Sequence, residues 1–217
     1  MQGLAGLDIG CGEGHNTRLV SLRAARMYAV DIAPTFIRYA RAAAPDPPAA
    51  IRYFVASALH LPFASATFDF ATAFMSFMDL PHPEIALAEA FRILKPGGFL
   101  QFSIMHPCFN TPYRKLLRDP AGKAYAVAVG RYFDESEPQI EEWLFSAAPS
   151  EVTAGLQPFR TLTFHRPLSV WFNLIVDAGF SIERVAEPFA DEEAVRRWPS
   201  VAKSKIVAYY LHLRCRK

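Results

Sequence analysis

The sequence is poor in cysteine and contains no long apolar run. Its three cysteines lack the paired spacings of a disulfide framework or a zinc site, so no metal is expected. No apolar stretch reaches the roughly 20 residues that cross a bilayer, and no signal peptide is recognisable. We therefore expect a chain of the reducing cytoplasm with no membrane partner.

A strong net charge is also missing. The formal net charge is +2 over 217 residues, which gives no electrostatic reason to expect a nucleic-acid partner. Internal repeats and low-complexity tracts are absent, and hydrophobic residues make up 52% of the chain, enough for one sizeable core. These properties predict a single domain over residues 1–217.

Apolar and amphipathic segments alternate through the first hundred residues. Strands are predicted at residues 4–9, 27–31, 51–55, 68–74 and 98–104, and helices at residues 16–24, 35–43 and 84–94. Prolines after the second helix and the K-P-G-G sequence after the third end these helices. Such alternation is typical of a parallel sheet with helices on both faces, which binds ligands at the carboxyl ends of its strands.

Residues 106–166 depart from this alternation. The segment is rich in proline and aromatic residues, has an acidic run, and is too long for a plain connection. Because it follows the fifth strand, we expect a lid over the substrate, with an ordinary surface loop as the alternative. A helix at residues 168–178 and strands at residues 180–186 and 206–213 are predicted to follow.

Residues 8–14 form the most informative motif, D-I-G-C-G-E-G, between the first predicted strand and the first predicted helix. Glycine permits a sharp turn and a close approach by a ligand, and the free N–H groups of the helix face that turn. Asp31 ends the second predicted strand, where a carboxylate can accept hydrogen bonds from both hydroxyls of a ribose. A dinucleotide fingerprint requires its third glycine at His15, whereas this chain has Gly14.

The D-x-G-x-G-x-G motif resembles the first motif of class I S-adenosylmethionine (SAM) dependent methyltransferases. Two later signatures agree in order and spacing: L-P-F at residues 61–63 with F-D at 68–69, and L-K-P-G-G at 94–98. The resemblance is strong from residue 4 to about residue 105. It implies a Rossmann-like, doubly wound α/β fold with a mostly parallel seven-stranded sheet, an antiparallel last strand and the lid after the fifth strand.

The same resemblance implies SAM as cofactor, S-adenosylhomocysteine as product and a small-molecule methyl acceptor, whose reacting atom can be oxygen, nitrogen or carbon. A SAM-binding protein without turnover and an NAD(P)-dependent oxidoreductase are the alternatives. Members of this family usually have a few dozen residues before the first strand that cover the methionine end of SAM. We therefore expect a short form or fragment, or a cover from another subunit, as in a homodimer.

By resemblance, the glycines shape the floor under the methionine and ribose, and the Phe74 carbonyl meets the ammonium of SAM. Asp8 either approaches that ammonium or orients the turn, and Ile32 packs on the adenine. Ser57 replaces the usual aspartate, which predicts weaker adenine recognition or reliance on neighbouring backbone. The predicted cofactor residues are Asp8, Gly10, Cys11, Gly12, Gly14, Asp31, Ile32, Ser57, Ala58, Leu59, Phe74, Met75 and Ser76.

Catalytic candidates are few, because in-line methyl transfer depends on positioning more than on a covalent nucleophile. His106 follows the fifth strand and could take a proton from the acceptor or hold the lid by a hydrogen bond. Asp79 follows the fourth strand and could orient a substrate hydroxyl or amine, or cap the next helix. Arg166 could bind a substrate carboxylate or pair with the acidic lid run.

Overall fold

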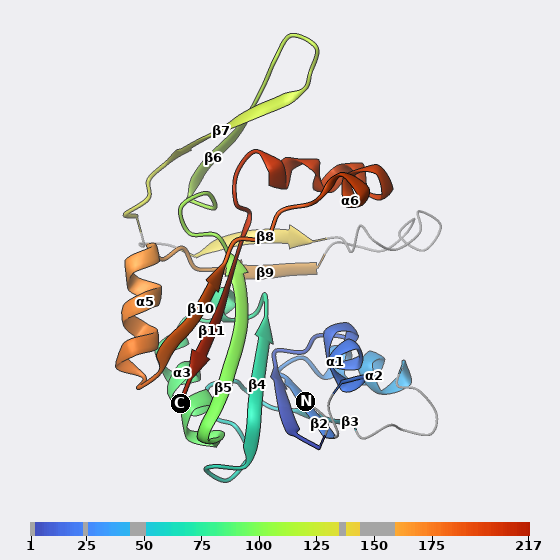
Figure 1. Ribbon diagram of the computed structural model, residues 1–217, viewed down its shortest axis with the longest axis vertical. Helices are drawn as coiled ribbons and strands as arrows, with labels where there is room; N and C mark the ends of the chain where they lie inside the picture. Colours follow the sequence, from blue (N-terminus) through green and yellow to red (C-terminus); the bar gives the residue numbers. More distant parts are fainter. Residues whose placement is uncertain (1–2, 24–25, 44–50, 135–137, 144–158) are drawn as a thin grey trace.

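A seven-stranded sheet forms the centre of the computed structural model, which describes residues 3–23, 26–43, 51–134, 138–143 and 159–217 (Figure 1). The strand order is β10-β11-β5-β4-β1-β2-β3, and only β11 runs antiparallel to its two neighbours. This sheet confirms the predicted Rossmann-like topology. The strands are β1 (Ala5–Ile9), β2 (Arg26–Asp31), β3 (Ile51–Val55), β4 (Phe68–Phe74), β5 (Leu94–Met105), β10 (Ser181–Ala186) and β11 (Tyr210–Arg216).

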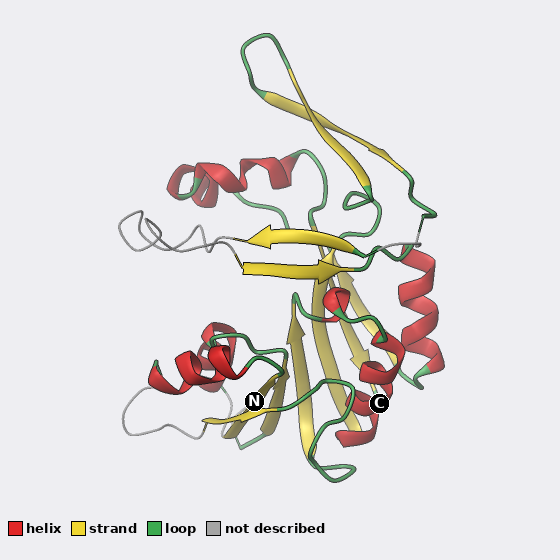
Figure 2. Ribbon diagram, turned by 180° about the vertical axis from the view of Figure 1, so that it is seen from behind, coloured by secondary structure: helices red, strands yellow, loops and turns green. Residues whose placement is uncertain are grey.

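Helices cover both faces of the sheet. Alternate side chains of β2 enter two separate buried clusters: Met27 and Ala29 pack with Ile37 of α2, whereas Val30 packs in the cluster that contains residues of α3 and α5. Figures 1 and 2 show α1 and α2 beside β1–β3, and α3 and α5 towards the opposite end of the sheet. The helices are α1 (His15–Ser21), α2 (Pro34–Ala42), α3 (Pro83–Ile93) and α5 (Leu168–Asp177).

The later signature motifs form hydrogen bonds with the scaffold around the sheet rather than with the cofactor edge. In the L-P-F motif, the Leu61 N–H donates to Glu89 Oε2 of α3 at 2.7 Å, and the Phe63 carbonyl accepts from Arg92 Nη1 at 2.7 Å. In the F-D motif, the Asp69 carboxylate accepts from the Ala5 N–H at 2.9 Å and from Lys95 Nζ at 2.7 Å. These bonds join β1, β4, α3 and the start of β5, so the motifs stabilise the scaffold that positions the glycine turn.

The lid contains two hairpins. One pairs β6 (Tyr113–Arg118) with β7 (Ala124–Gly130), and the other pairs β8 (Gln139–Trp143) with β9 (Phe159–Thr163). The β8–β9 hairpin lies across the carboxyl ends of β4 and β5, whereas β6–β7 projects away from the sheet (Figures 1 and 2). Part of the predicted lid, residues 135–137 and 144–158, lies outside the described residues.

The starts of two strands differ from the predictions. The last strand begins at Tyr210 rather than near residue 206, because the short helices α6 (Glu192–Arg197) and η2 (Pro199–Lys205) precede it. The first of these begins where Asp191 accepts a hydrogen bond from the Ala194 N–H at 2.7 Å. The K-P-G-G sequence belongs to β5 itself rather than preceding it. Among the described residues, no helix has the length and apolarity needed to span a membrane.

Candidate functional site

The glycine turn after β1 folds back on β2. The N–H groups of Gly10 and Cys11 both donate to the Val30 carbonyl, at 2.8 and 3.0 Å. Gly10, Gly12 and Gly14 all adopt positive φ angles, +71°, +55° and +81°, which side chains other than glycine rarely tolerate. The turn therefore depends on glycine at all three positions, as its spacing predicted.

The three glycines have different surroundings. A Cβ on Gly10 would lie 2.5 Å from the Ser76 Cβ, and one on Gly14 would lie 2.7 Å from the Tyr53 hydroxyl, so both positions are packed against protein. A Cβ on Gly12 would meet nothing within 4 Å. Gly12 thus faces open space at the carboxyl end of the sheet, which fits the close approach of a bound nucleoside cofactor.

Asp31 connects the glycine turn to the start of α2. Its Oδ2 accepts from the Gly12 N–H at 2.8 Å and its Oδ1 accepts from the Ala33 N–H at 2.9 Å. The N-cap position of α2 is Ala33, so Asp31 is not the ordinary helix cap. Each carboxylate oxygen has a second acceptor site, and the side chain is partly exposed. Asp31 can therefore accept hydrogen bonds from a ribose while it holds Gly12.

Asp8 is buried beneath the turn, with 1% of its surface exposed. Its two carboxylate oxygens accept from the Thr17 and Thr72 hydroxyls, at 2.5 and 2.8 Å, which joins β1 to α1 and β4. Burial raises the pKa of Asp8, and the two hydroxyl donors partly oppose that rise. The structure therefore shows that Asp8 joins β1 to α1 and β4 beneath the turn, whereas its contact with an ammonium group stays a prediction.

Burial also controls the pKa of the Cys11 thiol. Loss of water, together with the nearby Asp8 and Asp31 carboxylates, raises the pKa of the Cys11 thiol well above its ordinary value. A thiolate is the form that reacts with oxidants and electrophiles. Cys11 therefore fits a space-filling role in the turn and not a redox role.

The predicted adenine side of the site lies beside Asp31. Ile32 follows it with 72% of its surface exposed, so its apolar side chain is available to a planar ring. The Ala56 N–H donates to the Asp31 carbonyl at 3.0 Å, which brings the loop after β3 to this position. In that loop the Ser57 Oγ accepts from the Leu59 N–H at 3.2 Å, and Ala58 and Leu59 pack on the core.

The end of β4 completes this side of the site. Met75 has a φ of +55°, unusual for a residue with a side chain, and its N–H donates to the Ser103 carbonyl at 3.0 Å. Ser76 Oγ donates to the Ile9 carbonyl at 2.9 Å, immediately before the glycine turn. Strained backbone is common where a site must be held in one shape. Phe74, Met75 and Ser76 thus lie at the predicted edge, and their contacts with a cofactor stay predictions.

Asp79 lies in the short helix η1 (Phe77–Asp79) beneath the lid. Its Oδ1 accepts from the Thr163 Oγ1 at 3.1 Å, and the N-cap of α3 is His82. The helix-capping interpretation of Asp79 is therefore wrong. Burial, with the nearby Glu141 carboxylate, raises the pKa of Asp79 to about 7.

His106 is buried at the end of β5, with 3% of its surface exposed. Its Nδ1 accepts from the Cys108 N–H at 3.2 Å, so Nε2 carries the proton and donates to Glu187 Oε1 at 2.8 Å. In this arrangement neither nitrogen has a free lone pair with which to take a proton from an acceptor. These contacts favour the alternative in which His106 holds the lid, and its role as a general base stays a prediction.

Two neighbouring lid residues also bind backbone. Arg166 Nη2 donates to the Leu80 and Pro81 carbonyls at 2.9 and 3.0 Å, so the guanidinium holds the chain after η1. His165, which sequence reasoning left without a role, has Nε2 2.7 Å from the Tyr132 carbonyl and Nδ1 3.2 Å from the Asn110 carbonyl. No local motif marks this position, because its partners are distant in the sequence.

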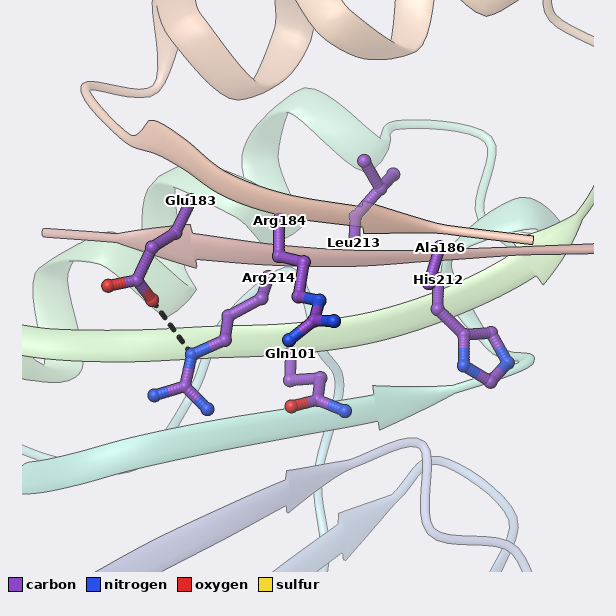
Figure 3. A pocket seen from close by; sticks show the side chains of 7 residues that line it. All are labelled: Gln101, Glu183, Arg184, Ala186, His212, Leu213 and Arg214. Atoms are coloured by element: carbon purple, nitrogen blue, oxygen red, sulfur yellow. Dashed lines mark hydrogen bonds and ion pairs between the residues drawn. The ribbon is translucent and has the colours of Figure 1, made fainter. Parts of the chain in front are cut away.

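A separate concavity of about 640 Å³ opens on the face of β5, β11 and β10 (Figure 3). The side chains of Gln101, Arg184, His212 and Arg214 project into it from three neighbouring strands, and Arg214 Nε donates to Glu183 Oε2 at 2.8 Å. Partial burial lowers the pKa of His212, which favours its neutral form. This concavity includes none of the predicted cofactor or catalytic residues.

The N-terminal part of the chain resembles a known family of domains. The family model described as "Methyltransferase domain" matches residues 7–102, which include the glycine turn, Asp31 and the end of β4. Over these residues the chain is similar to methyltransferase domains. The observed strand order and the glycine turn agree with this likeness.

Several members of the family are similar to this chain. It is 32% identical over 112 residues to the O-methyltransferase cnsE of Penicillium expansum, covering 49% of this chain and 41% of that protein. It is 28% identical over 153 residues to a ubiquinone biosynthesis O-methyltransferase of Xanthomonas oryzae pv. oryzae, covering 70% of this chain and 59% of that protein. The chain therefore spans about half the length of these curated relatives.

A solved structure shares the whole fold. The crystal structure of an S-adenosylmethionine dependent methyltransferase from Mesorhizobium loti has a TM-score of 0.80 and 24% sequence identity, and the match covers 100% of this chain and 92% of that one. At this level of identity the likeness establishes the fold.

Proposed function

We propose that this protein transfers a methyl group from SAM to a small molecule. The observation that supports this most is the geometry around Gly12, whose N–H is held by Asp31 while its α-carbon faces open space. A nucleoside lying against Gly12 would meet the Asp31 carboxylate at its ribose and the exposed Ile32 beyond it. The residues present therefore fit SAM.

When bound, SAM supplies a methyl group on a positively charged sulfur. The protein has to hold the acceptor in line with that methyl group and exclude water, and positioning of this kind can contribute several kcal/mol. The β8–β9 hairpin over the ends of β4 and β5 is suited to that task (Figure 1). Two relatives named as O-methyltransferases favour oxygen as the acceptor atom.

We also propose that the protein acts in the cytoplasm, without a nucleic-acid or membrane partner. A reducing compartment would keep Cys11, Cys108 and Cys215 as free thiols. A homodimer that covers the cofactor is a further proposal, and size-exclusion chromatography with light scattering tests it.

The test is methyl transfer from radiolabelled SAM to the small-molecule fraction of a cell extract. Wild-type protein should label at least one metabolite, and Asp31→Ala should lose most of that activity. Asp191→Ala is the matched control, because Asp191 also accepts a backbone hydrogen bond but lies at α6. Binding of S-adenosylhomocysteine without any labelled product would favour a non-catalytic SAM-binding protein, and binding of NADH in place of SAM would favour an oxidoreductase.

A further inference from the structure

Asp79 is enclosed between the end of β4 and the lid. The Thr163 hydroxyl of β9 donates to Asp79 Oδ1 at 3.1 Å, and the Phe164 N–H next to it donates to the Met78 carbonyl at 3.0 Å. The β8–β9 hairpin therefore rests directly on η1. The Asp79 carboxylate therefore faces the underside of the lid.

A short chain of contacts joins Asp79 to the glycine turn. The Asp79 N–H donates to the Ser76 carbonyl at 3.1 Å, and the Ser76 hydroxyl donates to the Ile9 carbonyl at 2.9 Å. The Ser76 side chain also occupies the space that a Cβ on Gly10 would need. Asp79 thus lies one helical turn after Ser76, and Ser76 contacts the glycine turn.

The lid provides the polar groups that face Asp79. Thr163 and Thr161 of β9 offer hydroxyl groups, whereas Glu141 of β8 adds a second negative charge. Among the described residues, no cation forms an ion pair with Asp79. The neighbouring charged groups are engaged elsewhere: Arg166 on backbone carbonyls, His106 on Glu187 and His82 on Glu84.

We propose that Asp79 accepts the proton of the methyl acceptor beneath the β8–β9 hairpin, beside Thr163 and Glu141, and that the acceptor presents an uncharged or cationic O–H or N–H group. This inference rests on the proposed function. Two carboxylates beneath one lid would repel a carboxylate acceptor, whereas a hydroxyl or ammonium group can donate to Asp79.

The proposed step balances for a hydroxyl acceptor. The acceptor oxygen forms a bond to the methyl carbon as the methyl–sulfur bond breaks, and the sulfur retains that electron pair. The hydroxyl proton passes to the Asp79 carboxylate, which later releases it to water. A base with a pKa near the working pH is suited to this transfer, and the pKa of Asp79 is about 7.

Substitutions at two lid residues should shift the pKa of Asp79 in opposite directions. Glu141 raises the pKa of Asp79, so Glu141→Gln should lower it. The Thr163 hydroxyl lowers the pKa of Asp79, so Thr163→Val should raise it. Matched controls are Glu142→Gln, next along β8, where the carboxylate pairs with Arg160 at 3.4 Å, and Thr111→Val, where a buried hydroxyl donates to the Tyr113 carbonyl at 2.6 Å.

The first measurement needs no acceptor. The ¹³Cγ shift of Asp79 in aspartate-labelled protein, assigned with Asp79→Asn, is followed from pH 4 to pH 9 with S-adenosylhomocysteine present. We expect a pKa near 7 in the wild type, shifts of opposite sign in Glu141→Gln and Thr163→Val, and no shift in the two controls. An ordinary aspartate pKa in the wild type, or equal shifts in the controls, would overturn the inference.

The second measurement uses the acceptor found in the radiolabel screen. Asp79→Asn should lower kcat about 10²-fold or more and flatten the acidic limb of the pH–rate profile, with S-adenosylhomocysteine affinity nearly unchanged. Undiminished turnover in Asp79→Asn, or a carboxylate as the methylated group, would overturn the inference. Absence of any transfer by the wild type would instead refute the proposed function.

Discussion

Replacing Asp79 with asparagine should stabilise this protein at neutral and alkaline pH. The pKa of Asp79 rises from 3.8 to about 7 on folding, so the folded protein binds a proton that the unfolded chain has already released. Wild-type stability is therefore lowered progressively as the pH rises from about 4 to about 7, and then stays constant. Asp79→Asn removes the charge and with it this loss.

The size of the expected stabilisation follows from the pKa shift of Asp79. Each pKa unit corresponds to about 1.4 kcal/mol, and a shift of about three units gives roughly 4 kcal/mol. Asp79 is only partly buried, so solvent screening reduces this value, and we expect Asp79→Asn to gain about 2–4 kcal/mol at pH 8. At pH 4 the two proteins should be about equally stable, because the wild-type carboxyl group is neutral in the folded state.

Urea unfolding followed by circular dichroism at several pH values measures this difference directly. Asp69→Asn is a control of opposite sign. Hydrogen bonds from Lys95 Nζ and the Ala5 N–H lower the pKa of Asp69, so its contribution is stabilising at pH 7 and is lost in acid. If Asp79→Asn were no more stable than the wild type at pH 8, the assignment of a partly buried, destabilised carboxylate to Asp79 would be wrong.

Three other substitutions or modifications test separate parts of the site. Gly12→Ala should weaken S-adenosylhomocysteine binding at least tenfold by calorimetry, whereas Gly122→Ala, with a similar φ of +79° and equally open surroundings, should leave it unchanged. His106→Ala should reduce stability by about 2–3 kcal/mol through two lost hydrogen bonds, and should retain the acidic limb of the pH–rate profile. Cys11 and Cys215, whose thiol pKa values are raised by burial, should resist iodoacetamide in the folded protein and react on unfolding, as mass spectrometry will show.

The core of the fold was predictable because local patterns determine it. The segment 68–74 coincides with β4, since buried parallel strands are nearly continuous in apolar residues. The segment 51–55 coincides with β3, an edge strand whose residues Ile51 and Tyr53 are buried. The glycine turn was predictable for a similar reason: its positive φ angles leave little choice of residue. Both features depend on neighbours within a few positions of the chain.

The lid was predictable only as an insertion. The pairing of β8 with β9 joins residues on either side of a long intervening segment, and no turn motif specifies it. α6 is six residues long and has no buried residue, so it lacks the apolar periodicity that marks longer helices. The extra helices before β11 were missed for this reason.

The roles of the two catalytic candidates depend on distant contacts. The partner of His106 Nε2 is Glu187, 81 residues away, and the partner of Asp79 Oδ1 is Thr163, 84 residues away. A sequence pattern locates both residues at the carboxyl edge of the sheet but does not reveal these partners. The distinction between a lid support and a buried carboxylate therefore came from the structure.

The central claim is that Asp31 and the glycine turn hold SAM, and isothermal titration with S-adenosylhomocysteine tests it most directly. The wild type should bind one equivalent saturably, and Asp31→Ala should bind about ten- to a hundredfold more weakly. The loss of charge-assisted hydrogen bonds worth about 1.5–3 kcal/mol each, partly replaced by water, accounts for that range. Asp191→Ala should bind like the wild type. No binding by the folded wild type at millimolar ligand, or an unchanged dissociation constant in Asp31→Ala, would contradict the account.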